Sequence, residues 1–295
     1  MEIGVALPQM APGYGSTTTV DWARRIDAGP FSSVSAGERV TFGNPEMVAA
    51  LGACAAVTER VRIFANLWVL PQHPMPMVAQ QIGTLDQLAG GRLEVAVGVG
   101  GREHDYRALG ASFRGRHQAL DDKVAELKRL LAGEPPFDGA DPVGPMCVQP
   151  GGPRILAGAM GPKAMRRAAR WADGISGFSI AGDAAEIAGA GALADECWAE
   201  AGRTGAPRKV SGCFVALGVP DAAEALHAFT ARYLGFLGPD LAEAVAATAR
   251  VNSPDALAAV LDGAERAGCD EFVLVPATTD PRFLDVAAEV VADRA

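Results

Sequence analysis

The chain lacks the residue patterns of disulfide and metal chemistry. Its five cysteines are scattered, no two of them have CxxC spacing, and an odd number cannot all pair with one another. Reduced and mostly buried thiols are therefore expected, as in a cytoplasmic protein. The four histidines are equally dispersed, so the sequence predicts no metal site.

Signals for export, membrane insertion and nucleic-acid binding are also missing. The N-terminal residues have no basic segment of a signal peptide, and no apolar run approaches the ~20 residues that a membrane span needs. The net charge is −9 without a block of like charge, whereas a phosphate backbone normally requires a basic face. We therefore expect a cytoplasmic protein that acts on a small molecule and contacts neither membrane nor nucleic acid.

Two nucleotide-binding motifs are absent as well: no GxGxxG opens a helix, and no GxxxxGK is followed by serine or threonine. Strand and helix patterns instead alternate along the chain. Eight segments have a strand pattern: 3–7, 31–36, 61–70, 93–99, 154–157, 174–178, 209–217 and 271–275. The pattern predicts an α/β fold, a (β/α)8 TIM barrel, as a single domain over residues 1–295 with irregular insertions, chiefly 134–153.

Helices are predicted between and after these strands. Asn44 is expected to cap the helix over 45–57, with Pro45 at its first position. The other predicted helices cover 19–28, 74–88, 117–131, 162–171, 184–201, 222–233, 239–248, 254–267 and 281–291.

The strand over 93–99 ends in a cluster of glycines that includes Gly98 and Gly100, and the charged residues Arg102 to Asp105 follow. A backbone without side chains lets a flat ligand approach closely. In an α/β barrel the carboxyl ends of the strands are also where chemistry takes place. The alternative is a tight strand-to-loop turn with nothing bound.

A second candidate site consists of Gly158, Ala159, Met160 and Gly161, where a strand leads into a helix that begins at Pro162. Free backbone N–H groups and the positive end of the helix dipole suit a phosphate there, and Lys163 can add charge. The alternative is an ordinary strand–helix turn.

Three further polar positions stand near predicted strand ends. Asn66 is either directed at a ligand or satisfied within the core, and His73 is either a helix-cap residue or a base. The charged pair Glu38-Arg39 faces either the barrel mouth or solvent.

These segments resemble those of the bacterial luciferase-like flavin-dependent oxidoreductases. The resemblance covers nearly the whole chain and rests on the order and spacing of several motifs. They are Thr58–Arg62, His73-Pro74, Thr84–Arg92, Asp105–Gly110, Gly161–Ala164 and Ala172-Asp173-Gly174. It implies a TIM barrel that binds FMN, or the deazaflavin coenzyme F-420, at its carboxyl end.

The resemblance also implies roles for individual positions. The segment matching Gly158–Gly161 holds the cofactor phosphate, and a basic residue matching Arg116 assists it. The strand matching Ala65-Asn66 carries a non-prolyl cis peptide under the flavin ring, and Gly98 and Gly100 line the edge of that ring.

One departure from the family pattern concerns catalysis. Many relatives end the second strand with an acidic residue and a histidine, and this chain has Glu38-Arg39 there. Arginine remains charged and is a poor proton shuttle, although it can stabilise a developing oxyanion or an anionic substrate. The candidate catalytic residues are therefore Glu38, Arg39, His104 and Tyr106.

Three functional hypotheses remain open from the sequence. The first is a monooxygenase that uses reduced FMN and O2 on a small organic substrate, with a separate flavin reductase as supplier. The second is a coenzyme F-420-dependent oxidoreductase that transfers hydride, and the third is a non-catalytic flavin-binding homologue. The resemblance also allows a homodimer, and no motif identifies the substrate.

Overall fold

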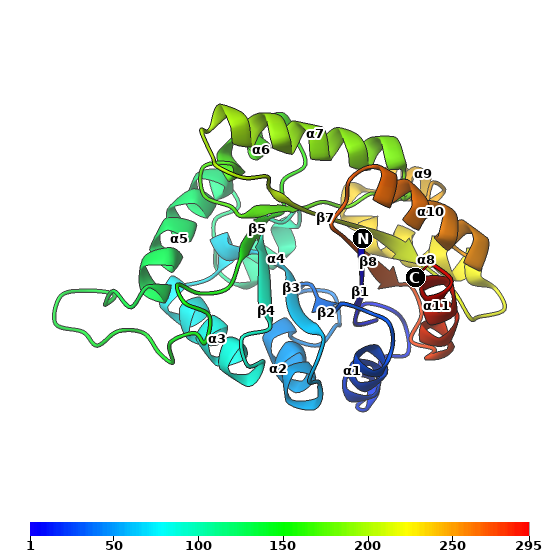
Figure 1. Cartoon of the computed structure of the whole chain (residues 1–295), viewed down its shortest axis with the longest axis horizontal. Coiled ribbons are helices and arrows are strands. Elements are labelled where there is room, and N and C mark those ends of the chain that lie inside the picture. Colours follow the sequence, from blue (N-terminus) through cyan, green and yellow to red (C-terminus); the bar gives the residue numbers. More distant parts are fainter. Residues whose placement is uncertain (295) are drawn as a thin grey trace.

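The computed structural model describes residues 1–294, which form a closed barrel of eight parallel strands (Figure 1). The strands follow one another around the barrel in sequence order, and residues 2–5 of the first pair with residues 271–274 of the last. Their bounds are β1 (Glu2–Ala6), β2 (Ser33–Ala36), β3 (Arg62–Trp68), β4 (Leu93–Val97), β5 (Ile155–Ala157), β6 (Gly174–Ser176), β7 (Arg208–Val215) and β8 (Glu271–Pro276).

Helices surround the barrel and connect successive strands (Figure 1). Their bounds are α1 (Thr18–Ala28), α2 (Met47–Val57), α3 (Met75–Leu88), α4 (Glu103–Ala108), α5 (Arg116–Leu131), α6 (Pro162–Ala168), α7 (Ala184–Glu200), α8 (Ala222–Leu234), α9 (Pro239–Ala246), α10 (Pro254–Arg266) and α11 (Arg282–Ala292), with short 3₁₀ turns η1 (Leu70–Gln72) and η2 (Gly235–Leu237). The predicted (β/α)8 barrel and its eight strands are confirmed. No helix within residues 1–294 is both long and apolar enough to cross a bilayer.

The irregular insertion predicted over 134–153 contains no helix or strand and projects beyond the ring of helices (Figure 1). Its returning end is attached to α3. Asp86 of α3 accepts hydrogen bonds from the backbone N–H of Gln149 at 3.0 Å and from its side-chain amide at 2.8 Å. Gln87 donates to the carbonyl of Met146 at 2.8 Å. The insertion is therefore a surface excursion of the barrel.

The start of α2 differs from the prediction. The helix begins at Met47, and the carboxylate of Glu46 caps it by accepting a hydrogen bond from the N–H of Ala49 at 2.6 Å. Asn44 instead donates its side-chain amide to the carbonyl of Arg39 at 3.2 Å. Asn44 therefore stabilises the loop after β2 and does not cap the helix. Helix α4 was not predicted, because six residues are too few to show a helical repeat.

The interior of the barrel is filled by a small set of apolar side chains from alternating strand positions. Phe64, Ala96, Leu156, Val210 and Val273 form one buried cluster that contains no helix residue. A larger cluster packs the outward strand faces against the helices. The barrel centre is consequently a packed core, and any ligand must bind at one of its ends.

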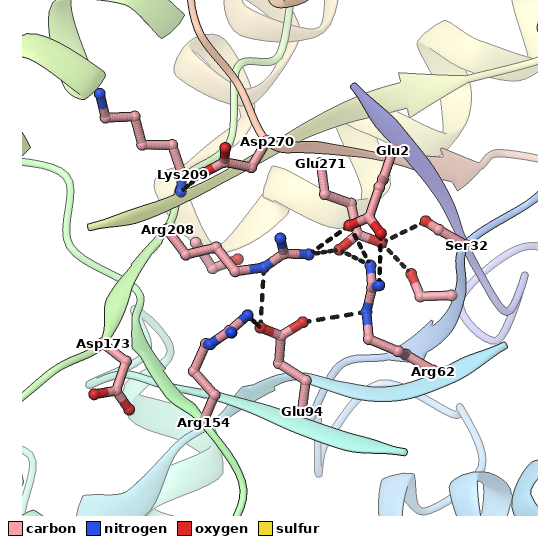
Figure 2. Close-up of polar contacts among 12 residues, drawn as sticks. Glu2, Ser32, Arg62, Glu94, Arg154, Asp173, Arg208, Lys209, Asp270 and Glu271 are labelled. Atoms are coloured by element: carbon pink, nitrogen blue, oxygen red, sulfur yellow. Dashed lines mark hydrogen bonds and ion pairs between the residues drawn. The ribbon is translucent and has the colours of Figure 1, made fainter. Parts of the chain in front are cut away.

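The amino end of the barrel is closed by a network of charged side chains at the first residues of the strands (Figure 2). Arg62 Nη2 lies 2.8 Å from Glu2 Oε2 and 2.6 Å from Glu271 Oε2. Arg208 contacts Glu271 Oε2 at 2.6 Å and Glu94 Oε1 at 3.1 Å. Burial raises the pKa of Glu94 despite these arginines. This network fills the end of the barrel opposite the one where barrel chemistry occurs.

Candidate functional site

A cavity of about 610 Å³ opens at the carboxyl ends of the strands. Segments that follow nearly every strand contribute to it, among them Met10 after β1, Arg39 after β2, Gly100 after β4, Gly158 after β5 and Phe178 after β6. This volume is in the usual range for a small-molecule site. The expected location of chemistry at this end therefore coincides with a cavity of suitable size.

The end of β3 forms one wall of the cavity. The peptide bond between Asn66 and Leu67 is cis, one residue beyond the position implied by the family resemblance. The Asn66 Oδ1 atom accepts a hydrogen bond from Ser176 Oγ at 2.7 Å, which orients the amide. Both Asn66 and Leu67 line the cavity, whereas Ala65 is fully buried behind them.

The two predicted glycine segments flank Leu67. Gly100 lines the cavity and has a φ of 60°, and a side-chain carbon there would lie 3.0 Å from Val69 Cγ1. Gly158 also lines the cavity, while Gly98 lies behind it against the side chain of Leu67. The missing side chains at these positions leave room for Leu67 and for the opening above it.

Glu38 lines the cavity, and both of its carboxylate oxygens are engaged. Oε2 accepts a hydrogen bond from the N–H of Val69 at 2.7 Å, and Oε1 lies 2.6 Å from His73 Nε2. The carbonyl of His73 in turn accepts a hydrogen bond from Lys123. Glu38 therefore fastens the loop between β3 and α3 to the end of β2, and His73 is its partner.

Replacing Glu38 with alanine is expected to lower the free energy of unfolding by about 2–3 kcal/mol, because it removes two hydrogen bonds to a largely buried carboxylate. Urea denaturation monitored by circular dichroism measures this loss. Glu38→Gln is the matched control, since its amide can still accept from Val69 and donate to His73, and it should cost about half as much or less. Equal losses in the two variants would contradict this role.

Two of the candidate catalytic residues do not line the cavity. Tyr106 is fully buried, and its hydroxyl donates to the carbonyl of Val99 at 2.5 Å. Burial raises the pKa of this hydroxyl to about 12. His104 is exposed on α4. Tyr106 thus holds the glycine-rich loop in place from behind, and the structure does not bring His104 to the cavity.

The second predicted segment contributes Gly158, Met160 and Gly161 to the cavity, and His117 of α5 lines it beside them. Ala159 is buried, and Met160 is 78 % exposed. Lys163 is exposed in the first turn of α6 and does not line the cavity. His117 is a neighbour that the sequence did not point to, because it lies 41 or more residues away from the glycine segment in the printed sequence.

The corner of the cavity around His117 has a positive electrostatic environment. Burial and the nearby guanidinium groups of Arg116 and Arg167 lower the pKa of His117. Arg116 stacks 3.7 Å from the centroid of the Phe113 ring, and its buried Nε atom has no hydrogen-bond partner within residues 1–294. Arg167 donates to the carbonyl of His117 at 2.6 Å and is paired with Asp121 at 2.5 Å, so Arg116 supplies the unbalanced charge of this corner. This corner is therefore suited to an anion.

The part of the chain that the structure describes contains no cluster of histidine, cysteine and carboxylate side chains that could hold a metal ion. All five cysteines are unpaired thiols, and burial raises the pKa of Cys54 to about 12. The polar side chains at the cavity are instead carboxylates, guanidinium groups, amides, hydroxyls and an imidazole.

The parallel barrel with a large cavity at its carboxyl end defines the molecule as a protein of the (β/α)8 class. The family model for luciferase-like monooxygenases matches residues 1–266, and the chain belongs to that family. Among its relatives, an uncharacterized protein of Mycobacterium tuberculosis is 34% identical over 189 residues, which are 58% of this chain and 63% of that protein. The match thus spans less than two thirds of that relative.

Two further comparisons concern proteins with named activities. The 4-hydroxyprotoasukamycin monooxygenase of Streptomyces nodosus subsp. asukaensis is 28% identical over 130 residues, 42% of this chain and 34% of that protein. The solved structure of the monooxygenase RslO1 from Streptomyces bottropensis superposes with a TM-score of 0.79 at 21% identity, covering 100% of this chain and 99% of that one. At this identity the likeness to RslO1 shows the shared fold.

Proposed function

We propose that the chain is a flavin-dependent monooxygenase that uses reduced FMN and O2 on a small organic substrate, with a separate flavin reductase supplying the reduced cofactor. The observation that carries this proposal is the cavity itself, which is lined largely by apolar side chains and has guanidinium groups beside His117. When bound, FMN supplies the electron transfer to oxygen that no protein side chain provides. Membership in the luciferase-like monooxygenase family supports the same conclusion.

The polar atoms of the cavity fit the edge of a flavin ring. Gln9 Oε1 and Gln72 Oε1 are buried, line the cavity and have no hydrogen-bond partner within residues 1–294. A buried polar atom without a partner costs free energy, so a ligand that pairs with it is favoured. The pyrimidine edge of a flavin presents an N–H donor, which suits these two amide oxygens as acceptors.

The cationic corner fits the phosphate of the cofactor. Gly161 has open space around its Cα atom, and the guanidinium group of Arg116 supplies positive charge beside His117. A phosphate placed there would meet backbone N–H groups without obstruction from a side chain. In this proposal Lys163 contributes long-range charge without direct contact.

The apolar residues would exclude water from the reacting part of the cofactor. Phe178, Phe214 and Tyr233 form adjacent aromatic contacts, with ring centroids 4.7 Å apart for the first pair and 4.9 Å apart for the second. All three line the cavity. Exclusion of water protects a reactive reduced flavin from unproductive decay and strengthens electrostatic interactions inside the cavity.

A coenzyme F-420-dependent hydride transfer is the second candidate function. A structure of an F420-dependent secondary alcohol dehydrogenase in complex with an F420-acetone adduct superposes with a TM-score of 0.79 at 20% identity, over 99% of this chain and 98% of that one. The two cofactors share a tricyclic ring and a phosphorylated side chain, so the same corner could receive either. F-420 carries additional negative charges in its tail, whereas the chain has a net charge of −9.

Anaerobic titration with reduced FMN and with reduced F-420 distinguishes these functions. We expect reduced FMN to bind with micromolar or tighter affinity and at least tenfold more tightly than reduced F-420, as measured by equilibrium dialysis. The opposite preference would replace the proposed monooxygenase with a hydride-transfer enzyme. Failure to bind either cofactor would contradict both proposed functions.

A further inference from the structure

Arg39 lies in the loop after β2, and three aromatic rings surround its guanidinium group. Its guanidinium carbon is 3.8 Å from the centroid of the Tyr233 ring, 5.0 Å from that of Phe42 and 5.5 Å from that of Phe236. Asn44 holds the backbone carbonyl of Arg39 from behind. Cation–π contacts of this kind fix the plane of a guanidinium group while leaving its N–H edge free to donate hydrogen bonds.

The charge of Arg39 has no counter-ion within residues 1–294. No carboxylate of the described chain lies within 4.0 Å of its guanidinium nitrogens, and Nη1 is buried without a hydrogen-bond partner. The adjacent Glu38 is not available, because its two oxygens are engaged by Val69 and His73. A buried guanidinium nitrogen without a partner is an unsatisfied donor, so a ligand that offers it an acceptor is favoured.

The neighbouring charges add to this positive potential. Arg102 also lines the cavity, and burial together with the charge of Arg39 lowers its pKa. Asp105 balances Arg102 at 3.3 Å, so Arg39 remains the uncompensated group. The guanidinium carbon of Arg232 lies 4.7 Å from the centroid of the Phe42 ring. This end of the cavity is therefore cationic in a chain whose net charge is −9.

The cavity wall beside Arg39 consists largely of aromatic rings. Phe214 contacts Phe178, Phe229 and Tyr233 with centroid separations of 4.7, 5.1 and 4.9 Å. These four residues line the cavity together with Arg39. Such a wall offers stacking and edge contacts to a planar apolar body.

We propose that the substrate of this site has a planar, aromatic or otherwise unsaturated body bearing one anionic group, such as a carboxylate or phenolate, and that Arg39 binds this group. The inference rests on the proposed function and specifies its substrate class. Arg39 acts here as a substrate-binding residue that holds the anion by its N–H edge while the body of the substrate contacts the rings.

A pair of matched probes tests this inference by direct binding. Titration calorimetry compares 2-naphthoate with its neutral analogue 2-naphthamide, using the full chain both alone and saturated with FMN. We expect 2-naphthoate to bind at least tenfold more tightly, which corresponds to ~1.4 kcal/mol. Arg39→Gln should weaken binding of 2-naphthoate at least tenfold and leave 2-naphthamide within twofold.

The control variant is Arg232→Gln, because Arg232 is exposed, contacts the same Phe42 ring and does not line the cavity. It should change the affinity for 2-naphthoate by less than threefold.

The inference would be overturned by equal binding of the two probes, by binding of neither, or by an unchanged ratio of their affinities in Arg39→Gln. So would a loss of FMN affinity in Arg39→Gln, because it would make Arg39 a cofactor-binding residue. The probes are also titrated into the chain without FMN, so this test of Arg39 does not depend on FMN binding. Failure of the proposed function would appear separately, as a lack of FMN binding.

Discussion

Replacing Glu271 with alanine is expected to lower the free energy of unfolding by about 3–5 kcal/mol, the largest effect on stability expected from one substitution here. Glu271 is fully buried, and its carboxylate receives hydrogen bonds from Ser32, Ser33, Arg62 and Arg208 at 2.6–2.8 Å (Figure 2). Its removal leaves the two partly buried guanidinium groups of Arg62 and Arg208 with less negative charge between them. Chemical denaturation measures the loss.

The same substitution tests whether stability at the amino end of the barrel is independent of ligand binding at the carboxyl end. Glu271 lies at the amino end, whereas the cavity is at the carboxyl end, so the folded Glu271→Ala variant should bind reduced FMN within twofold of the unchanged chain. Glu134→Gln is the control, because its ion pair with Arg129 is about half exposed on both sides and should contribute at most about 1 kcal/mol. Similar stability losses in the two variants would contradict a special role for the network.

Replacing Gly161 with aspartate is expected to weaken the affinity for reduced FMN at least tenfold (~1.4 kcal/mol), because it places a carboxylate at the proposed phosphate position. The backbone of Gly161 is extended, and no heavy atom lies within 4 Å of an added side-chain carbon. Aspartate is also a favourable residue at the start of a helix, so the fold should not suffer. Equilibrium dialysis at low and high salt measures the change in affinity.

Gly161→Asn is the matched control for this charge. It has nearly the same shape and the same capping ability as aspartate, and it should keep the FMN affinity within threefold. Gly158 is a poorer position for the test, since a side chain there would collide with Leu67. Equal weakening by aspartate and asparagine would mean that shape, and not phosphate charge, matters at Gly161.

The sequence predicted the barrel because the pattern of apolar residues within each strand and helix indicates its type. Alternation of short apolar runs with helical repeats requires no knowledge of distant residues, and all eight strands follow that pattern.

The motif around Arg60 also has a local structural role. Arg60 donates to the carbonyls of Gly29 and Phe31 at the end of α1, and Asp27 accepts from the N–H of Val61. Some motif residues of the family thus fasten loops far from the cavity.

The pairings at the cavity could not be predicted in the same way. His73 and Glu38 are 35 residues apart in the sequence and meet only because β2 and β3 are neighbours in the barrel. Two of the three rings around Arg39, Tyr233 and Phe236, come from α8 and η2, much later in the chain. A single sequence shows which residue types stand at strand ends, but side-chain contacts between distant loops depend on the closed barrel.

The proposal of a monooxygenase is tested most directly by mixing the anaerobic complex of the chain and reduced FMN with oxygenated buffer in a stopped-flow spectrometer. We expect flavin reoxidation to include a phase that is absent from free reduced FMN and whose rate increases in proportion to the oxygen concentration. Reoxidation with the time course of free FMN, or a bound reduced flavin that does not react with oxygen, would contradict a monooxygenase.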